Sequence, residues 1–145
     1  KRNWEIIKLK ESTQKRSILD GVPASLPAML KSWRVQEKVG GVGFKWRDVS
    51  GSLDKIDEEF KELKFEIDNN NKKNIENELG DVFFSLVNFA RFLNVNPIDA
   101  LEKTNQKFIK RFKKMEQEIT NDKRKIEELE LAELDLYWKK VKKSQ

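Results

Sequence analysis

Apolar residues recur at helical spacing along most of this chain. In one segment they stand three or four positions apart, as on one face of an α-helix: Leu53, Ile56, Phe60, Leu63 and Ile67. Leu101, Phe108, Phe112, Met115 and Ile119 form a second such stripe. No stretch alternates apolar and polar residues between turn signals, as a half-buried strand would. We therefore predict an all-α fold, built as an antiparallel bundle of the four-helix type.

Capping and turn residues divide the chain into five predicted helices. The first runs from Leu26 to about Val39 and ends at the pair Gly40-Gly41. The second is capped by Ser50 or Ser52 and ends at the sequence DNNN, residues 68–71.

The remaining helices follow the same kind of signals. The third extends over residues 75–93. The fourth begins with Asn96 as its cap and Pro97 in its first position. The fifth follows a polar break near residues 120–125.

The third predicted helix has apolar residues on two sides. One side carries Ile75, Val82 and Leu86, and the far side carries Phe83, Phe84 and Val87. A helix that is apolar most of the way round is buried on two sides, so we expect a homodimer interface here.

The chain of 145 residues has the length of one domain. We expect residues 21–145 to form it and residues 1–20 to be a linker or the tail of a preceding domain. A weak echo supports this, because Trp4-x-x-Ile7-Lys8 resembles Trp138-x-x-Val141-Lys142.

Composition limits the available chemistry. The chain has no cysteine and no histidine, so catalysis would depend on carboxylates, amines, hydroxyls or a metal ion. The net charge is +5, but Lys and Glu residues are interspersed along the chain. This pattern does not indicate a dedicated nucleic-acid surface. No apolar stretch reaches the length of a membrane span, so we expect a cytoplasmic protein without a membrane partner.

Acidic residues flank the apolar stripes of the second and third helices. Glu59 and Glu62 stand three positions apart, as do Glu78 and Asp81, and a hairpin around DNNN lets the two pairs face each other. Acids near a helix N-terminus also suit the helix dipole, and most acidic side chains are simply solvated. Four converging carboxylates would need a hard cation such as Mg²⁺.

Basic and aromatic residues supply further candidates. Lys107 and Arg111 share one edge of the fourth helix, where they are either solvated side chains over apolar surface or phosphate ligands. We expect Trp33 and Trp46 to anchor the core or a loop. Trp138 lies beside a basic run, where stacking on a base is an alternative.

These features together resemble the MazG family of nucleoside triphosphate pyrophosphohydrolases, and the resemblance is closest to the C-terminal domain of its tandem-domain members. The acidic motif stands as Glu58-Glu59-x-x-Glu62 and Glu78-Leu79-Gly80-Asp81. The segments LPAMLKSWRVQEK, VGFKW, GDVFFSLVNFARFL and TNQKFIKRF flank it in the family's order.

The resemblance implies a dimeric all-α enzyme that hydrolyses nucleoside triphosphates to monophosphate and pyrophosphate, with water attacking the α-phosphorus. It implies Mg²⁺, with Mn²⁺ as an alternative, at the four metal ligands and catalytic residues Glu59, Glu62, Glu78 and Asp81. It also implies nucleotide contacts from Lys107, Arg111, Trp138, Lys55, Lys38 and Glu58. Two alternatives stay open, a non-catalytic helical interaction module and a specialised pyrophosphohydrolase of dUTP or a phosphoribosyl nucleotide.

Overall fold

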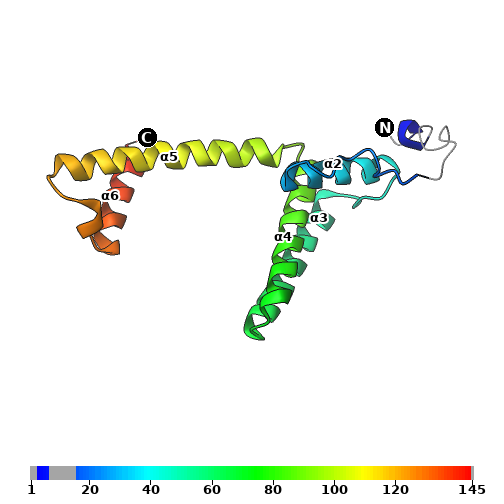
Figure 1. Cartoon of the computed structure of the whole chain (residues 1–145), viewed down its shortest axis with the longest axis horizontal. Helices are drawn as coiled ribbons and strands as arrows, with labels where there is room; N and C mark the ends of the chain where they lie inside the picture. Colours follow the sequence, from blue (N-terminus) through cyan, green and yellow to red (C-terminus); the bar gives the residue numbers. More distant parts are fainter. Residues whose placement is uncertain (1–2, 7–15, 145) are drawn as a thin grey trace. The chain divides into compact units, whose positions relative to one another are not determined.

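A computed structural model describes residues 3–6 and 16–144 of the chain. Every regular element in this part is helical (Figure 1). The elements are α2 (Ala28–Gly41), α3 (Val49–Asp68), α4 (Lys72–Phe92), α5 (Pro97–Asn121), the 3-10 turn η1 (Ile126–Glu128) and α6 (Leu131–Lys143). Residues 3–6 form one further helical turn. The predicted all-α class is confirmed, whereas the dimer stays a prediction. Of the predicted linker, residues 1–2 and 7–15 lie outside the described residues.

The chain divides into two compact units, Lys1–Ile98 and Asp99–Gln145. In the first unit α3 and α4 form a hairpin, and α2 packs against α4. The predicted DNNN turn joins the two long helices, and Asn70 adopts a left-handed conformation in it with φ of 57°. Asn71 then caps α4, its side chain accepting a hydrogen bond from the Asn74 amide.

The start of α4 differs from the prediction. The helix begins at Lys72, three residues before the predicted start, because Asn71 provides the cap. Its first turn contains no acidic residue, and Glu78 stands in its second turn. Since the stabilising effect of the helix dipole falls off within the first turn, it does not explain the acids at Glu78 and Asp81.

The end of α2 was also predicted wrongly. The helix continues through Gly40 and Gly41, and the left-handed residue is Gly43, with φ of 92°. Gly41 instead allows close packing, whereas a Cβ on Gly40 would make only an ordinary contact. A Cβ on Gly40 would lie 3.4 Å from Nη2 of Arg91, and a Cβ on Gly41 would lie 2.8 Å from Cγ of Glu5.

The cap of α3 is Asp48 and not a serine. The Asp48 carboxylate accepts a hydrogen bond of 2.8 Å from the Gly51 amide. Ser52, one of the two predicted caps, lies fully buried inside the helix, where its hydroxyl donates to the Val49 carbonyl. A carboxylate one residue before the helix competes better for the free amides than a serine already in its first turn.

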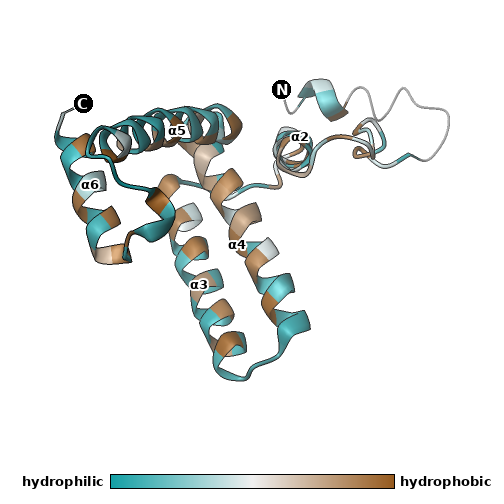
Figure 2. Ribbon diagram, turned by 60° about the vertical axis from the view of Figure 1, so that its left-hand side comes forward, coloured by the Kyte–Doolittle hydropathy of each residue, from teal (hydrophilic) through white to brown (hydrophobic). Residues whose placement is uncertain are grey.

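The first unit leaves much of its apolar surface exposed. Ile56, Val82 and Val87 are buried, but Phe60 and Phe83 are each about half exposed. Val87 was expected on the outer face with Phe83, and Leu86 on the inner one. The structure reverses these two, leaving Leu86 40% exposed. Hydrophobic residues recur along both helices of the hairpin (Figure 2).

The second unit has a conventional core. Met115 and Ile119 of α5 pack with Tyr137 and Val141 of α6. Phe112, Ile126, Leu129, Leu134 and Trp138 surround this cluster. As predicted, α5 starts at Pro97 and ends in the polar break near residue 121. The Asn96 side chain accepts a hydrogen bond from the Ile98 amide at that start.

Across the residues the structure describes, none of the helices combines the length and the apolar character that crossing a bilayer requires.

Candidate metal centre

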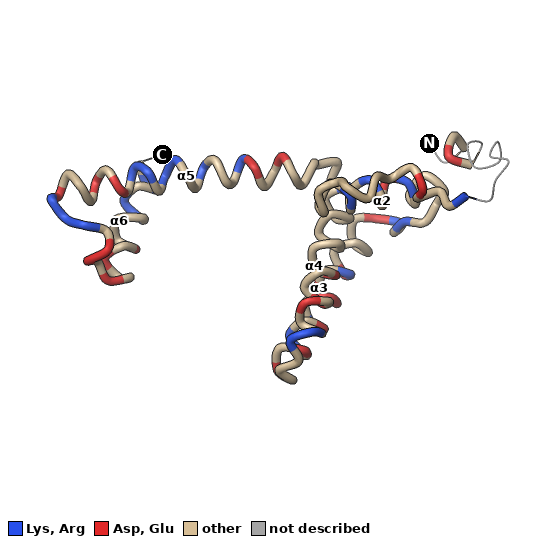
Figure 3. The backbone as a smooth tube through the Cα atoms, in the orientation of Figure 1, with Lys and Arg blue, Asp and Glu red and all other residues tan. Residues whose placement is uncertain are grey.

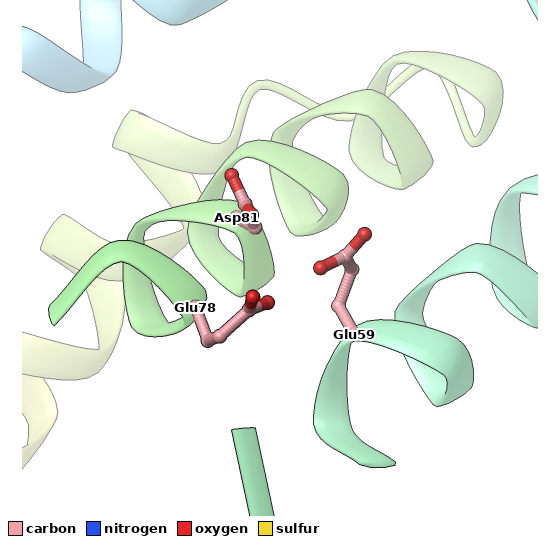
Figure 4. Close-up of side chains that lie close together, drawn as sticks. All are labelled: Glu59, Glu78 and Asp81. Atoms are coloured by element: carbon pink, nitrogen blue, oxygen red, sulfur yellow. The ribbon is translucent and has the colours of Figure 1, made fainter. Parts of the chain in front are cut away.

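Three carboxylates converge between the two helices of the hairpin. Glu59 comes from α3, and Glu78 and Asp81 come from α4 (Figure 4). One oxygen atom of each side chain lies within 4.8 Å of the others. The i, i+3 spacing on α4 places Glu78 and Asp81 on one side of the helix, facing Glu59. The structure therefore brings together three of the four predicted metal ligands.

Glu62, the fourth predicted ligand, lies outside this group of three. Its side chain is exposed and acts on Glu78, whose pKa it raises through charge repulsion and hydrogen bonding. Glu62 stands one turn after Glu59 on α3, so it extends the acidic surface along the hairpin. Glu62 therefore lies next to the group, and its role in metal binding or proton transfer stays a prediction.

The converging carboxylates are short of hydrogen-bond donors. Glu59 is buried, with 5% of its surface exposed. Its Oε1 atom lies 2.9 Å from Nζ of Lys55. Oε2 of Glu59 and Oε2 of Glu78 are also buried, and neither has a hydrogen-bond partner among residues 3–6 and 16–144. Buried anionic oxygen atoms without partners are costly.

The same crowding perturbs the ionisation of Glu78. Burial is the main cause, and repulsion by Glu62 together with the hydrogen bond to it comes next. With smaller repulsion from Asp81 and Glu59, these effects raise the pKa of Glu78 to about 7. Glu59 also raises the pKa of Lys55, mainly through their hydrogen bond, which favours the charged form of the lysine.

A divalent cation fits this arrangement. The group offers only carboxylate oxygens, which suit hard ions such as Mg²⁺ and Mn²⁺. The two unpartnered oxygens, one on Glu59 and one on Glu78, would gain a positive partner. Histidine and cysteine, the ligands typical of structural zinc sites, are absent from the sequence.

A cavity of about 470 Å³ lies next to the carboxylates within the first unit. It is bounded by α2, by the aromatic loop that contains Phe44 and Trp46, and by α4. Lys55 lines it and also contacts Glu59, so the lysine joins the cavity to the acidic group. Ser85 and Asn88 line it one and two turns after Asp81.

The remaining predicted nucleotide contacts lie in different places. Glu58 is exposed and pairs with Lys55 at 3.4 Å. Lys38 lies on α2, with its Nζ 3.7 Å from Glu5. Lys107 and Arg111 belong to the second unit and line one surface hollow on α5, a helix with many basic positions (Figure 3).

Trp138 also belongs to the second unit. Its ring packs at 5.1 Å from that of Phe108, and its side chain contributes to the apolar cluster. The carboxylates are thus in the first unit, and the basic pair and Trp138 are in the second. Their joint action on one nucleotide stays a prediction.

Two residues of the cavity were missed in the sequence. Gln36 is 3% exposed, and Arg91 stacks over the ring of Trp33 at 5.8 Å. A signal for Gln36 was available, since it follows Met29 by seven positions and Trp33 by three, on the apolar side of α2. Arg91 gave no comparable signal. Trp46, expected to be an anchor, lines the cavity and is 46% exposed.

Fold and site together define an all-helical protein with a carboxylate centre suited to a divalent cation. Residues 49–116, which include all the grouped carboxylates, match the family described as the MazG nucleotide pyrophosphohydrolase domain. The chain is also similar to proteins that carry this name.

The nucleoside triphosphate pyrophosphohydrolase/pyrophosphatase MazG of Thermotoga maritima is 45% identical over 142 residues, 97% of this chain and 54% of that protein. The nucleoside triphosphate pyrophosphohydrolase of Escherichia coli K12 is 34% identical over 98% of this chain and 56% of that protein. The uncharacterized protein YabN of Bacillus subtilis is 39% identical over 99% of this chain and 30% of its own length.

Residues 49–116 thus match the MazG family, and nearly the whole chain aligns with these relatives. The chain spans about half the length of the nucleoside triphosphate pyrophosphohydrolases it matches.

Proposed function

We propose that this protein hydrolyses nucleoside triphosphates to nucleoside monophosphate and pyrophosphate, with Mg²⁺ bound at Glu59, Glu78 and Asp81. The observation that carries the proposal is the convergence of these three carboxylates, two with unpartnered buried oxygens, inside the segment that matches the family. The names of the two pyrophosphohydrolase relatives support the same reaction.

Four residues of the first unit form the proposed metal site, three as ligands and one as the residue that orients a ligand. Oε2 of Glu59, Oε2 of Glu78 and the Asp81 carboxylate are the ligand groups. Lys55 holds Oε1 of Glu59 at 2.9 Å and thereby orients its other oxygen. A bound divalent cation neutralises phosphate charge and lowers the pKa of a water molecule.

The reaction also needs a proton acceptor. The oxygen of a water molecule bonds to the α-phosphorus, the bond from that phosphorus to the bridging oxygen breaks, and pyrophosphate leaves. We assign the proton of the water to the carboxylate of Glu62, which is exposed and lies beside Glu78. In a chain without histidine, a carboxylate is the natural general base.

Basic residues complete the proposed nucleotide contacts. Lys107 and Arg111 bind phosphate oxygens in this proposal, arginine through its planar fork and lysine as a point charge. They line the same hollow on α5, which supports their acting as a pair.

The direct test is an assay of pyrophosphate release across a panel of nucleoside triphosphates, with and without Mg²⁺. The proposal expects turnover that requires Mg²⁺ and yields equal amounts of monophosphate and pyrophosphate. Release of orthophosphate, or nucleotide binding without turnover, would contradict it. Turnover of a single nucleotide would instead indicate a specialised pyrophosphohydrolase.

We also propose that the protein acts as a homodimer. Phe60, Phe83 and Leu86 on the hairpin are each at least 40% exposed, and apolar surface of this kind marks an interface. Sedimentation should give the mass of a dimer, and Phe83→Glu should shift it towards the monomer. A wild-type protein that remains monomeric at high concentration would refute this part.

A further inference from the structure

The cavity beside the carboxylates contains two buried polar residues that the proposed reaction does not use, Gln36 and Ser85. Gln36 lines this cavity of about 470 Å³, a volume within the roughly 300–1,000 Å³ of small-molecule sites. Only 3% of its surface is exposed. Most other walls are apolar or aromatic, including Val35, Val39 and Trp46.

Two hydrogen bonds determine which way the Gln36 amide points. Its Nε2 atom donates to the Phe84 carbonyl at 3.0 Å and to the Ser32 hydroxyl at 3.2 Å. A backbone carbonyl can only accept, so the nitrogen must face Phe84. Both amide protons are then used, and Oε1 must lie on the other side.

That oxygen is an acceptor without a donor. Oε1 of Gln36 is buried, and no donor reaches it from the part of the chain that the structure describes. Native proteins leave few such atoms, and a water molecule, an ion or a ligand is a common partner for those that remain. A ligand that brings an N–H group into the cavity would satisfy it.

We propose that the cavity is the nucleobase subsite of this protein and that Oε1 of Gln36 accepts a hydrogen bond from an amino or imino N–H group of the base. The inference rests on the proposed function, because Lys55 connects the cavity to the carboxylates that would hold the triphosphate. Aromatic side chains of the loop, Phe44 and Trp46, supply surfaces on which a base can stack.

This subsite has a definite selectivity. Adenine, guanine, cytosine, uracil and thymine all present an N–H donor on the base-pairing edge, so a single acceptor accommodates each of them. A base without such a donor would leave Oε1 buried and unpartnered. Sites built around a hydrogen bond discriminate strongly against analogues that lack it.

The test compares ATP with purine riboside triphosphate, which carries hydrogen in place of the amino group. For the wild-type protein in the presence of Mg²⁺, kcat/KM should favour ATP by about tenfold to a hundredfold, as expected for an unsatisfied buried acceptor. Calorimetric Kd values for the same nucleotides give the comparison without depending on turnover.

The variant Gln36→Met removes the acceptor with little change in side-chain size. Its preference for ATP over purine riboside triphosphate should fall to near unity, mainly through loss of ATP activity. Thr120→Met, a change to the same residue at an exposed position of α5, is the control and should keep the wild-type preference. Thermal melts verify that both variants fold.

The outcomes separate the two proposals. Equal kcat/KM and equal Kd for the two nucleotides in the wild-type protein would overturn the base subsite while leaving the hydrolysis intact. An unchanged preference in a folded Gln36→Met variant would also overturn it. If neither nucleotide is hydrolysed, the reaction is refuted, and a preference in Kd alone still supports the subsite.

Discussion

The two units of this chain differ most in how they treat buried polar groups. The second unit packs a cluster around Ile119 and Val141, although Leu131 and Leu136 of the same unit are more than half exposed. Its charged groups pair near the surface, as Lys140 does with Glu118 at 3.0 Å. The first unit buries carboxylates that have unpartnered oxygens and exposes large side chains such as Phe60.

This difference between the units distinguishes groups that stabilise the fold from groups that bind a ligand or partner. Among the residues that the structure describes, the pairing of buried polar groups is complete around the buried cluster of the second unit. It is incomplete at the carboxylates of the first unit, where a ligand would complete it. In the first unit we assign the missing partners to a cation, a nucleotide and a second copy of the chain. The predictions below therefore expect substitutions at the carboxylates of the first unit to change activity and substitutions in the buried cluster of the second unit to change stability.

The largest effect is expected from the carboxylate group. Glu78→Gln should lower Mg²⁺-dependent pyrophosphate release by roughly a thousandfold, because several kcal/mol of transition-state stabilisation depend on the ion. The same variant should fold at least as stably as wild type without metal, since the change removes repulsion among acids. Glu116→Gln, exposed on α5, is the control. Retained activity in the folded Glu78→Gln variant would refute the site.

The next effect concerns the core of the second unit. Ile119 is 2% exposed, so Ile119→Ala should lower the free energy of unfolding by about 2–5 kcal/mol. Ile109→Ala, at a position 51% exposed on the same helix, should change it by about 0.5 kcal/mol or less. Denaturant unfolding measures both. Equal effects would mean that the cluster around Ile119 is not the core.

The third effect is a pH dependence confined to the first unit. The pKa of Glu78 is raised from 4.5 to about 7, so the folded state holds its proton more tightly than the unfolded state. Without divalent cations, the stabilisation that comes from protonated Glu78 should be complete below pH 4.5 and lost as the pH rises through 7. Mg²⁺ should oppose the loss, and Glu78→Gln should abolish it. Melting temperatures between pH 4 and pH 8 test the sign.

The smallest effect concerns a single hydrogen bond in the second unit. The Tyr137 hydroxyl donates to Oδ2 of Asp122 at 2.5 Å. Tyr137→Phe should cost about 1 kcal/mol of stability and leave pyrophosphate release unchanged. A large loss of turnover at full stability would place Tyr137 in the catalytic machinery and contradict the division between the units.

Sequence patterns predicted the parts of this fold that depend on local chemistry. The apolar periodicity found α3 and α5, and the turn residues found the junction between α3 and α4. Helix geometry and the spacing of Glu59, Glu78 and Asp81 predicted their convergence across that turn. The Asn96-Pro97 signal located the start of α5.

Features that depend on packing between segments were less predictable. Gly40 and Gly41 have the composition of a helix stop, but α2 continues through both, and Glu5 lies too close to Gly41 for a Cβ there. The cavity at Gln36 is built by α2, a loop and α4 together, so no single stretch of sequence predicts it. The spacing of the acids places Glu62 with the other three carboxylates. In the structure its exposed side chain lies outside the group of three and interacts with Glu78.

The most direct test of the central claim is a titration with Mn²⁺ followed by electron paramagnetic resonance. It is performed with a non-hydrolysable nucleoside triphosphate analogue present. The proteins compared are wild type, Glu59→Gln, Glu78→Gln and the control Glu116→Gln. We predict that wild type and Glu116→Gln bind Mn²⁺ with the same affinity and release it to Mg²⁺, whereas both cluster variants bind it much more weakly. Equal Mn²⁺ affinity in all four proteins would contradict the account.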